Sequence, residues 1–278
     1  MIEVVDPGPL TTIQDMGRTG LASLGVPRSG AFDRAALSLA NRLVGNPVDA
    51  AGLEVTYGGL VVVVRDAATV AITGAVCPGA DWGTALSLDA GATLRLGPPG
   101  SGLRSYVAIR GGVDVRAELG SRSTDVLSGL GPRSLRPGDV LPVGTQPRAP
   151  IVGATAPVPS AGPGRVLRVV LGPRQDWFTA DAVAALTTAR WTVRQDSNRI
   201  GIRLDGPRLH RVRSGELPSE ATLPGALQVP PDGRPILLGP DAPVTGGYPV
   251  IAVVRDGDLD AAAQLRPGDV VTFACAYP

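Results

Sequence analysis

"LRPGDV" occupies residues 135–140, and the same six residues return at 265–270. Each copy precedes an apolar stretch and lies near the end of one half of the chain. A Pro-Gly turn followed by Asp and a strand is common on its own, but six identical residues in equivalent places are not expected by chance. We therefore predict two similar barrel-like β-domains related by duplication. The alternative is one turn sequence that arose twice without common ancestry.

The chain around these copies has the pattern of a mostly β protein with a few short helices. Its 37 glycines and 27 prolines separate short β-branched runs, as many turns between strands would. Strands are predicted at 2–5, 53–56, 60–64, 68–73, 92–96, 105–110, 138–143, 165–171, 191–195, 200–204, 236–238, 249–254 and 269–274. Helices are predicted at 34–44, within 176–189 and at 258–265.

The domain boundary is predicted between the two copies. The stretch "QPRAPIVGATAPVPSAGPG" (146–164) has no periodicity and is rich in Pro, Ala and Gly, which is typical of a linker. We predict an N-terminal β-barrel domain at 1–150, a Pro/Ala/Gly-rich linker at 151–164 and a C-terminal β-barrel domain at 165–278. A length of 278 residues agrees with two domains.

Charge and composition exclude several classes of function. A net charge of +1 argues against bulk electrostatic binding to nucleic acid or to an anionic membrane. All 26 basic residues are arginines, which indicates either anion recognition or the codon usage of a GC-rich genome. Without lysine the chain forms no Schiff base and carries no biotin of its own. Cys77, Cys275 and the single His210 lack metal-ligand spacing, so we predict no metal site.

The N-terminus and the apolar runs indicate where the protein works. The chain starts with the strand-like "IEVVD" and shows no signal peptide, and its longest apolar run, 60–64, is too short to span a membrane. We therefore expect a cytoplasmic protein with no membrane partner.

One helix is preceded by unusual polar detail. In "VPRSGAFDRAALSLANRLVGN" (26–46), Asp33 can cap the helix that follows, and Gly45 can end it. Ser29 and Gly30 stand before that cap, and Asn41 stands among apolar residues. A helix that only fills a core does not need these residues. The simpler interpretation is that Asp33 is an N-cap and Ser29 a turn residue.

A second polar cluster lies in "GSRSTD" at 120–125. Arg122, Ser123, Thr124 and Asp125 place a guanidinium, hydroxyls and a carboxylate within a few residues. Such a cluster can hold a carboxylate or a planar amide, or it can be a polar turn that bonds to itself. The residues alone leave both interpretations open.

Two further features are equally open. The two glycines of Thr245-Gly246-Gly247-Tyr248 allow either close approach of a ligand or a β-bulge. Glu220 and Gln228 flank "LPG" and are either a carboxylate base with an amide hydrogen-bonder or surface polarity. Gly-rich pieces such as "GPPGSG" (97–102) lack the Lys-Ser/Thr of a phosphate-binding loop, so no P-loop ATP site is predicted.

Taken together, these stretches resemble the biotin-dependent carboxyltransferase-like proteins. That family includes allophanate hydrolase subunit 2, the sporulation regulator KipA and the C subunit of 5-oxoprolinase. The motifs that carry the resemblance are "PGPLTTIQDMGR" (7–18), "GVPRSGAFD" (25–33), "ANRLVGN" (40–46), "LEVTYGG" (53–59), "LGSRSTD" (119–125), "GIRL" (201–204), "GALQVPPDGRP" (225–235), "VTGGYPVIAVV" (244–254) and "QLRPGDVVTF" (264–273).

The resemblance implies a fold, partners and a reaction. The fold would be two tandem cyclophilin-like β-barrel domains. The partners would be a separate protein of the KipI or allophanate hydrolase subunit 1 type and a third subunit of the LamB/YcsF type. The reaction would be the ATP-dependent opening of 5-oxo-L-proline, a small-molecule amide, to L-glutamate, with ATP bound here or on a partner.

The resemblance also suggests roles for residues. Asp33 and Glu220 would handle protons, and Arg122 or Arg199 would stabilise charge. The substrate-binding set would be Ser29, Gly30, Ser123, Thr124, Asp125, Arg199, Gln228, Thr245, Gly246, Gly247 and Tyr248. Asn198 stands where family members often have Asp, which removes a charge but keeps hydrogen-bond capacity.

Two alternatives belong to other functional classes. The chain could be the carboxyltransferase component of a urea or allophanate enzyme, which takes a carboxyl group from biotin on a separate carrier. It could also be a non-catalytic regulator that acts, as KipA does, by binding a KipI-type partner.

Overall fold

The computed structural model describes residues 1–145, 149–151, 153, 155–157, 165–213, 215 and 217–276. The chain divides into two compact units. The first comprises Met1–Arg18 and Ser29–Ala161, and the second comprises Thr19–Arg28 and Gly162–Pro278. Most of the predicted linker at 151–164 lies outside the described residues, and the predicted domain boundaries stay a prediction.

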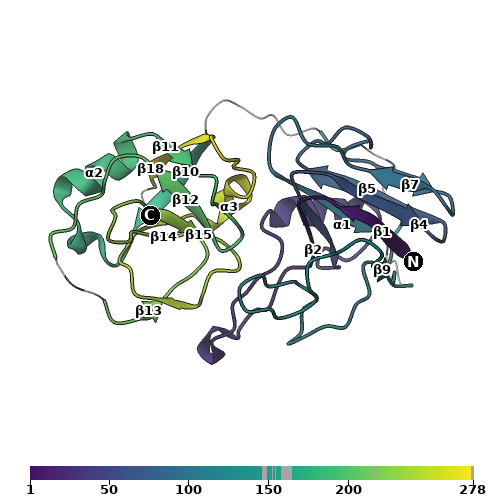
Figure 1. The fold of residues 1–278 in the computed structure, drawn as a ribbon, viewed down its shortest axis with the longest axis horizontal. Coiled ribbons are helices and arrows are strands. Elements are labelled where there is room, and N and C mark those ends of the chain that lie inside the picture. Colours follow the sequence, from purple (N-terminus) through teal and green to yellow (C-terminus); the bar gives the residue numbers. More distant parts are fainter. Residues whose placement is uncertain are drawn as a thin grey trace. The chain divides into compact units, whose positions relative to one another are not determined.

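The first unit contains two β-sheets (Figure 1). The smaller sheet has the order β7 (Thr93–Arg95), β4 (Leu60–Val64), β1 (Ile2–Pro7) and β9 (Val140–Leu141). The larger has the order β2 (Leu10–Gln14), β3 (Gly52–Thr56), β8 (Arg104–Ile109), β5 (Ala68–Gly74) and β6 (Ala85–Leu88). All of these neighbouring strands pair antiparallel.

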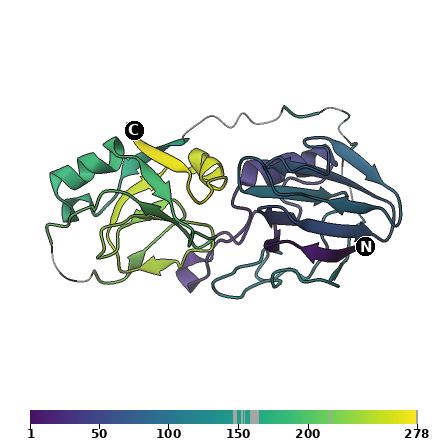
Figure 2. The same cartoon turned by 45° about the horizontal axis from the view of Figure 1, so that its top comes forward.

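A shared apolar core joins the two sheets. In β4, Leu60, Val62 and Val64 are buried while the residues between them are half-buried, so one face of the strand points inward. They cluster with inward residues of the larger sheet such as Leu53 and Ile72. Helix α1 (Arg34–Leu43) lies against β5 and β8. Figure 2 shows this helix, in dark purple, beside the strands of the first unit. This packing fixes the position at which α1 begins.

The second unit contains a closed barrel of seven strands. Their order is β10 (Arg165–Leu171), β17 (Val250–Val254), β14 (Ala226–Gln228), β15 (Ile236–Leu238), β12 (Gly201–Asp205), β11 (Trp191–Val193) and β18 (Val270–Cys275). Parallel pairing of β10 with β18 closes it. The unit also holds the two-stranded sheet β13 (Glu220–Ala221) with β16 (Thr245–Gly246), the helices α2 (Ala180–Thr188) and α3 (Asp256–Ala262), and the short 3₁₀ helices Ala22–Leu24 and Gln175–Trp177.

Both copies of LRPGDV form the same turn. Asp139 Oδ2 accepts a hydrogen bond at 2.8 Å from the backbone N–H three residues before it, and Asp269 Oδ2 does the same at 2.9 Å. The preceding Gly138 and Gly268 have φ of 86° and 90°, the left-handed region that favours glycine. The following strands, β9 and β18, then pair antiparallel with β1 and β11. The repeated sequence therefore has one structural role in both halves.

The predicted fold class is confirmed in its main features. The protein is mostly β with three short α-helices among the described residues, and α1 and α2 lie within the predicted helix ranges, while α3 begins two residues earlier than predicted. Within the described part of the chain a closed barrel occurs in the second unit, and a second one is not confirmed. The edge strands β7 and β9 of the first unit have only three and two residues, which leaves little backbone to join the two sheets.

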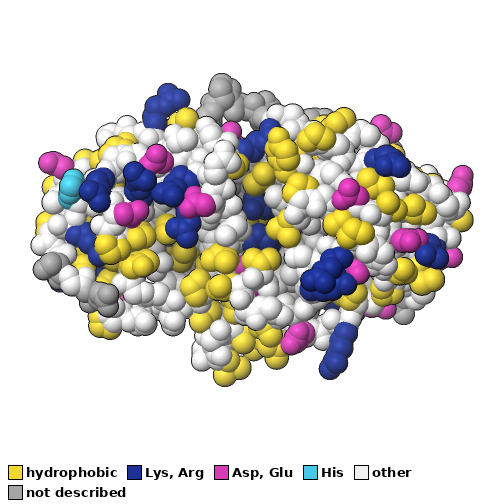
Figure 3. Space-filling view, viewed as in Figure 1, with side chains coloured by type: hydrophobic (Ala, Val, Ile, Leu, Met, Phe, Trp, Pro, Cys, Tyr) yellow, Lys and Arg dark blue, Asp and Glu magenta, His cyan; other side chains and the backbone are white. Residues whose placement is uncertain are grey.

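The described surface agrees with a near-neutral chain. Figure 3 shows arginines and acidic side chains interspersed on one face rather than gathered into a single basic patch. Within the described ranges, no helix has both the length and the apolar character to cross a bilayer.

Candidate functional site

The carboxylate of Asp15 organises the polar loop at 121–123. Asp15 follows directly after β2 and is buried. Its Oδ1 accepts hydrogen bonds from Ser121 Oγ and Ser123 Oγ, both at 2.6 Å, and its Oδ2 accepts one from the Arg122 backbone N–H at 2.6 Å. Hydrogen bonds to a buried carboxylate are stronger than neutral ones. One charged group thus holds three consecutive residues that lie more than a hundred positions away in the sequence.

Arg18 also holds the same loop. Its Nη2 donates to the Ser123 carbonyl at 2.7 Å, and its Nε donates to the Glu118 carbonyl at 3.0 Å. Gly131 makes room for this guanidinium, because a Cβ there would lie 2.1 Å from the Ser123 oxygen and 2.7 Å from Arg18 Nη2. The Nη1 of Arg18 is buried and has no hydrogen-bond partner among the described residues, so one strong donor is available to a ligand.

The segment before α1 runs against the Asp15 loop. Ala31 N–H donates to the Asp15 carbonyl at 2.9 Å. A Cβ on Gly30 would lie 2.8 Å from the Gly17 nitrogen, so only glycine allows this approach. Ser29 has φ of 53°, an uncommon conformation for a residue with a side chain, and its buried Oγ has no partner within the described chain. Strained and unsatisfied polar groups of this kind are characteristic of functional sites.

A buried network holds the start of α1. Glu54 Oε2 accepts hydrogen bonds from Phe32 N–H at 2.9 Å and from Tyr106 Oη at 2.7 Å. The Asp33 N–H donates to the same Tyr106 Oη at 2.7 Å. Burial, reinforced by the nearby Glu54, raises the pKa of Tyr106 well above its ordinary value, so the phenol keeps its proton. Arg104 approaches Glu54 Oε1 at 3.5 Å and covers the Phe32 ring.

Asp33 is the N-cap of α1, as the sequence indicates. Its Oδ1 accepts from the Ala36 N–H at 2.9 Å. The puzzling Asn41 supports the loop after the helix: its Nδ2 donates to the Ala50 carbonyl at 2.7 Å, and its Oδ1 accepts from Asn46 at 3.1 Å. Asp33 therefore has the N-cap role that the sequence indicates, and Asn41 braces the loop after the helix.

The remaining predicted residues of the 120–125 cluster differ in their surroundings. The Arg122 guanidinium donates to the Val115 carbonyl at 2.7 Å and to Asp114 at 2.9 Å. Asp125 Oδ1 caps the turn that follows it, whereas its Oδ2 is buried without a partner in the described structure. Thr124 Oγ1 is buried and unpaired in the same sense. The polar-turn and ligand-binding interpretations thus both have support in this cluster.

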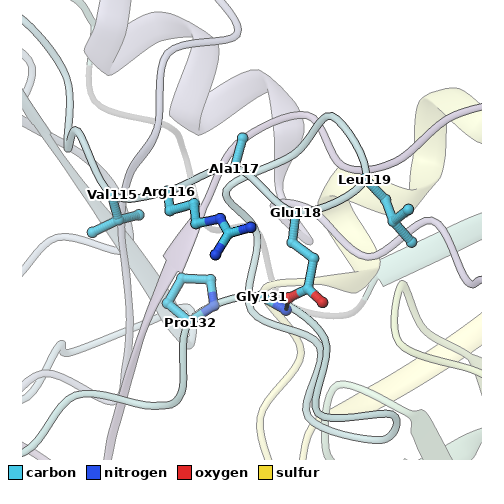
Figure 4. A pocket seen from close by; sticks show the side chains of 7 residues that line it. All are labelled: Val115, Arg116, Ala117, Glu118, Leu119, Gly131 and Pro132. Atoms are coloured by element: carbon cyan, nitrogen blue, oxygen red, sulfur yellow. Dashed lines mark hydrogen bonds between the residues drawn. The ribbon is translucent and has the colours of Figure 1, made fainter.

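A pocket of about 530 Å³ opens beside this loop (Figure 4). The residues that line it are Val115, Arg116, Ala117, Glu118, Leu119, Gly131 and Pro132. The pocket is lined by two segments, residues 115–119 and residues 131–132. Glu118 links them, because its Oε2 accepts a hydrogen bond from the Gly131 N–H at 2.8 Å. None of these residues is among the site residues predicted from the sequence, although Leu119 lies in the motif "LGSRSTD" (119–125).

In the second unit, Arg199 forms a buried ion pair. Its Nε and Nη2 donate to the two carboxylate oxygens of Asp241 at 2.8 and 2.9 Å, and both side chains are almost fully buried. Asn198 instead accepts from the backbone N–H groups of the two residues after Arg199, at 2.8 and 3.2 Å. The acid that orients Arg199 is therefore Asp241, and Asn198 shapes the turn.

The other predicted residues of the second unit gather around β13 and β16. Glu220 pairs with Arg174 through two hydrogen bonds, which lower the pKa of Glu220. A lower pKa makes this carboxylate a weaker proton acceptor. A Cβ on Gly246 would lie 2.5 Å from Gln228 Nε2, so a larger residue there would displace that amide. Gln228 Nε2 also donates weakly, at 3.4 Å, to the carbonyl of Tyr248.

The structure thus groups the predicted residues in two sets. The first unit holds Ser29, Gly30, Asp33, Arg122, Ser123, Thr124 and Asp125, and the second holds Arg199, Glu220, Gln228, Thr245, Gly246, Gly247 and Tyr248. Sequence reasoning missed Asp15, Arg18, Glu54, Tyr106 and Asp241. Asp15 and Arg18 lie in the motif "PGPLTTIQDMGR" (7–18), but neither is among the predicted site residues. Among the described residues, no three His, Cys, Asp or Glu side chains are placed to hold a metal ion.

Comparison with known proteins gives a consistent result. A family profile described as "Carboxyltransferase domain, subdomain A and B" matches residues 24–275. The chain is 39% identical to the C subunit of 5-oxoprolinase from Escherichia coli K12 over 282 residues, which cover 98% of this chain and 90% of that protein. It is 33% identical to the corresponding 5-oxoprolinase protein of Haemophilus influenzae, with the same coverage.

Longer proteins also contain a similar sequence and fold. The chain is 34% identical to urea amidolyase of Lachancea kluyveri over 98% of its own length, but it covers 17% of that protein. The crystal structure of Kluyveromyces lactis urea amidolyase superposes with a TM-score of 0.93 at 31% identity, over 99% of this chain and 19% of that one. The chain thus spans about a fifth of the solved urea amidolyase.

Proposed function

The chain belongs to the carboxyltransferase subdomain A and B family, and from this premise we propose that it is the C subunit of a 5-oxoprolinase. The observation that carries the proposal is its 39% identity to the E. coli protein over nearly the full length of both chains. The urea amidolyase relatives, by contrast, contain this sequence as a small part of a much longer polypeptide. The chain is accordingly an enzyme subunit.

The proposed reaction opens the lactam of 5-oxo-L-proline. Addition of water breaks the ring C–N bond and gives L-glutamate, with a new carboxylate and an amine. ATP, when bound to the complex, supplies the free energy that an unreactive amide needs. This sequence has no lysine and therefore no phosphate-binding loop of the type that ends in Lys-Ser/Thr. We propose that ATP is bound by the assembled complex, on this chain at a site of another type or on a partner subunit.

Several buried polar atoms of the first unit have no hydrogen-bond partner in the described structure. Arg18 Nη1, Ser29 Oγ and Thr124 Oγ1 are donors without partners in the described structure, which suit a carbonyl or carboxylate oxygen. Gln14 Oε1 and Asp125 Oδ2 are buried acceptors of the same kind, which suit an N–H group. Unsatisfied buried groups of this kind cost roughly 1–3 kcal/mol each.

The proposed catalytic residues differ in how well they suit their roles. Asp33 is a buried carboxylate at the start of α1 and remains our candidate for proton transfer. Arg122 can stabilise charge with its half-exposed guanidinium. Glu220, held by Arg174 with a lowered pKa, is better suited to bind than to accept a proton.

The partners and the finer fold assignment rest on the family resemblance. The names of the relatives support partner subunits, and we propose one of the KipI or allophanate hydrolase subunit 1 type and one of the LamB/YcsF type. We also propose that both units are variants of a cyclophilin-like β-fold and that the complex is cytoplasmic. Co-purification of this chain with the two proposed partners tests the assembly, and recovery of this chain alone would contradict it.

A second candidate function has one observation in its favour. The match to urea amidolyase in both sequence and fold would also suit a carboxyltransferase that uses biotin on a separate carrier. Titration of this chain with free biotin and with 5-oxo-L-proline, measured by isothermal titration calorimetry, separates the two functions. Biotin binding together with no effect of 5-oxo-L-proline would favour carboxyl transfer.

A further inference from the structure

An open pocket lies between Val115–Leu119 and Gly131–Pro132, and its volume is that of a small-molecule site. Its volume of about 530 Å³ falls within the range of small-molecule pockets. The buried Arg18 holds the Glu118 carbonyl, and Glu118 in turn holds the Gly131 N–H. Arg122 holds the Val115 carbonyl at 2.7 Å. Both walls are therefore fixed before any ligand arrives, which reduces the entropic cost of binding.

The charges inside the pocket are complementary to a particular ligand class. Figure 4 shows the Arg116 guanidinium lying between Pro132 and Glu118. Among the described residues, no hydrogen bond or ion pair of Arg116 is found. One oxygen of Glu118 is bound by Gly131, which leaves the second oxygen to face a ligand. The rest of the lining is apolar apart from backbone groups.

Leu119, at the rim of the pocket, has an unfavourable backbone conformation. Leu119 has φ of 50° and is 53% exposed at the tip of a tight turn in which Glu118 and Ser121 exchange backbone hydrogen bonds. Glycine or asparagine is favoured at such a position, and an exposed leucine there gains nothing for folding. Backbone strain of this kind is concentrated at functional sites, which makes Leu119 a candidate contact residue.

We propose that this pocket binds a small carboxylic acid that also carries an N–H or ammonium group. Arg116 pairs with the carboxylate, Glu118 accepts the N–H, and Leu119 and Pro132 cover the carbon skeleton. Arginine is the side chain best suited to a planar carboxylate. The identity of the ligand rests on the proposed function, because the lactam substrate and the amino-acid product both belong to this class.

The test measures binding to the full-length chain by isothermal titration calorimetry, without partner subunits. The probes are 5-oxo-L-proline, L-glutamate, glutarate, which lacks nitrogen, and 2-pyrrolidinone, which lacks the carboxylate. We expect 2-pyrrolidinone to bind at least about tenfold more weakly than 5-oxo-L-proline. Arg116→Gln should raise the Kd of every carboxylate probe by at least about tenfold.

Two variants serve as comparisons. Arg95→Gln removes an exposed arginine of β7 outside the pocket and should leave every Kd unchanged. Glu118→Gln keeps an oxygen for the Gly131 N–H but loses the charge, so it should weaken L-glutamate more than glutarate. Equal Kd values for the Arg116 and Arg95 variants, or no binding of any carboxylate probe at millimolar concentration, would overturn the proposal.

The result is separable from the reaction. If the complex releases glutamate but Arg116→Gln leaves the Kd of every probe unchanged, the pocket proposal fails and the proposed function stands. If the probes bind through Arg116 but the assembled complex opens no lactam, the pocket stands and the proposed function fails.

Discussion

Replacing Asp15 with Asn should disrupt the loop at residues 121–123, which belongs to the candidate site of the first unit. The Oδ1 position keeps an oxygen that can still accept from Ser121 and Ser123. The Oδ2 position becomes an NH₂ group that faces the Arg122 N–H, so a 2.6 Å hydrogen bond is replaced by two opposed donors. The side chain is buried, and water cannot replace the lost acceptor.

The size of the effect follows from the bonds involved. Loss of one charge-assisted bond costs roughly 1.5–3 kcal/mol, and the bonds that remain lose their charge assistance, so we expect a loss of about 2–4 kcal/mol in the free energy of unfolding of the first unit. That corresponds to a fall in Tm of roughly 5–15 °C for a domain of this size. Lactam opening by the assembled complex should fall with it, because Arg122 and Ser123 lose their positions.

The assay is differential scanning calorimetry of Asp15→Asn beside Asp114→Asn. Asp114 is an exposed acid that pairs with Arg122, and its replacement should change stability by less than about 1 kcal/mol. Calorimetry resolves the transitions of the two units if they unfold separately. If Asp15→Asn melts within error of Asp114→Asn, Asp15 does not organise the loop and the reasoning is refuted.

Three further predictions concern single contacts. Gly30→Ala should cost about 2–4 kcal/mol by calorimetry, because its Cβ would meet backbone from a left-handed conformation; an unchanged Tm would contradict the close approach. The hydrogen bond from Arg133 lowers the pKa of Asp139 in the folded protein from its ordinary value of 3.8. The pair therefore stabilises the fold fully above pH 3.8, and this stabilisation is lost as the pH falls through the lowered pKa of folded Asp139. Arg133→Gln should therefore destabilise the fold slightly at pH 7 and not at all in acid, and a pH-independent difference in urea unfolding would refute this. Asp241→Asn should cost roughly 3–5 kcal/mol, since Arg199 stays buried without a carboxylate, and replacing both residues with leucine should recover much of it in the same urea assay.

Local sequence patterns were sufficient to predict individual turns and strands. The repeated LRPGDV predicted equivalent turns, and Asp139 and Asp269 make equivalent bonds. Local sequence patterns did not show that the barrel of the second unit is closed. Closure depends on parallel pairing of β10 with β18, which lie about a hundred residues apart in the sequence. Nothing in the periodicity of the first unit revealed that its strands lie in two sheets, since sheet order depends on long-range pairing.

Prediction of the candidate site from the sequence was limited in the same way, because its contacts join distant parts of the chain. The sequence marked Ser29, Gly30 and Ser123 because glycines and hydroxyls gathered there. It did not mark Asp15 or Asp241, because each is a single acid whose partner lies far along the chain, over distances of 108 and 42 residues. Their importance comes from burial and hydrogen bonding, which no local pattern records.

The most direct test of the account is glutamate release from 5-oxo-L-proline with ATP by the assembled complex, with each subunit omitted in turn. The account predicts release that requires this chain, the two proposed partners and ATP. Release that continues when this chain is omitted, or no release from a complex shown to be assembled, would contradict its assignment as a 5-oxoprolinase subunit.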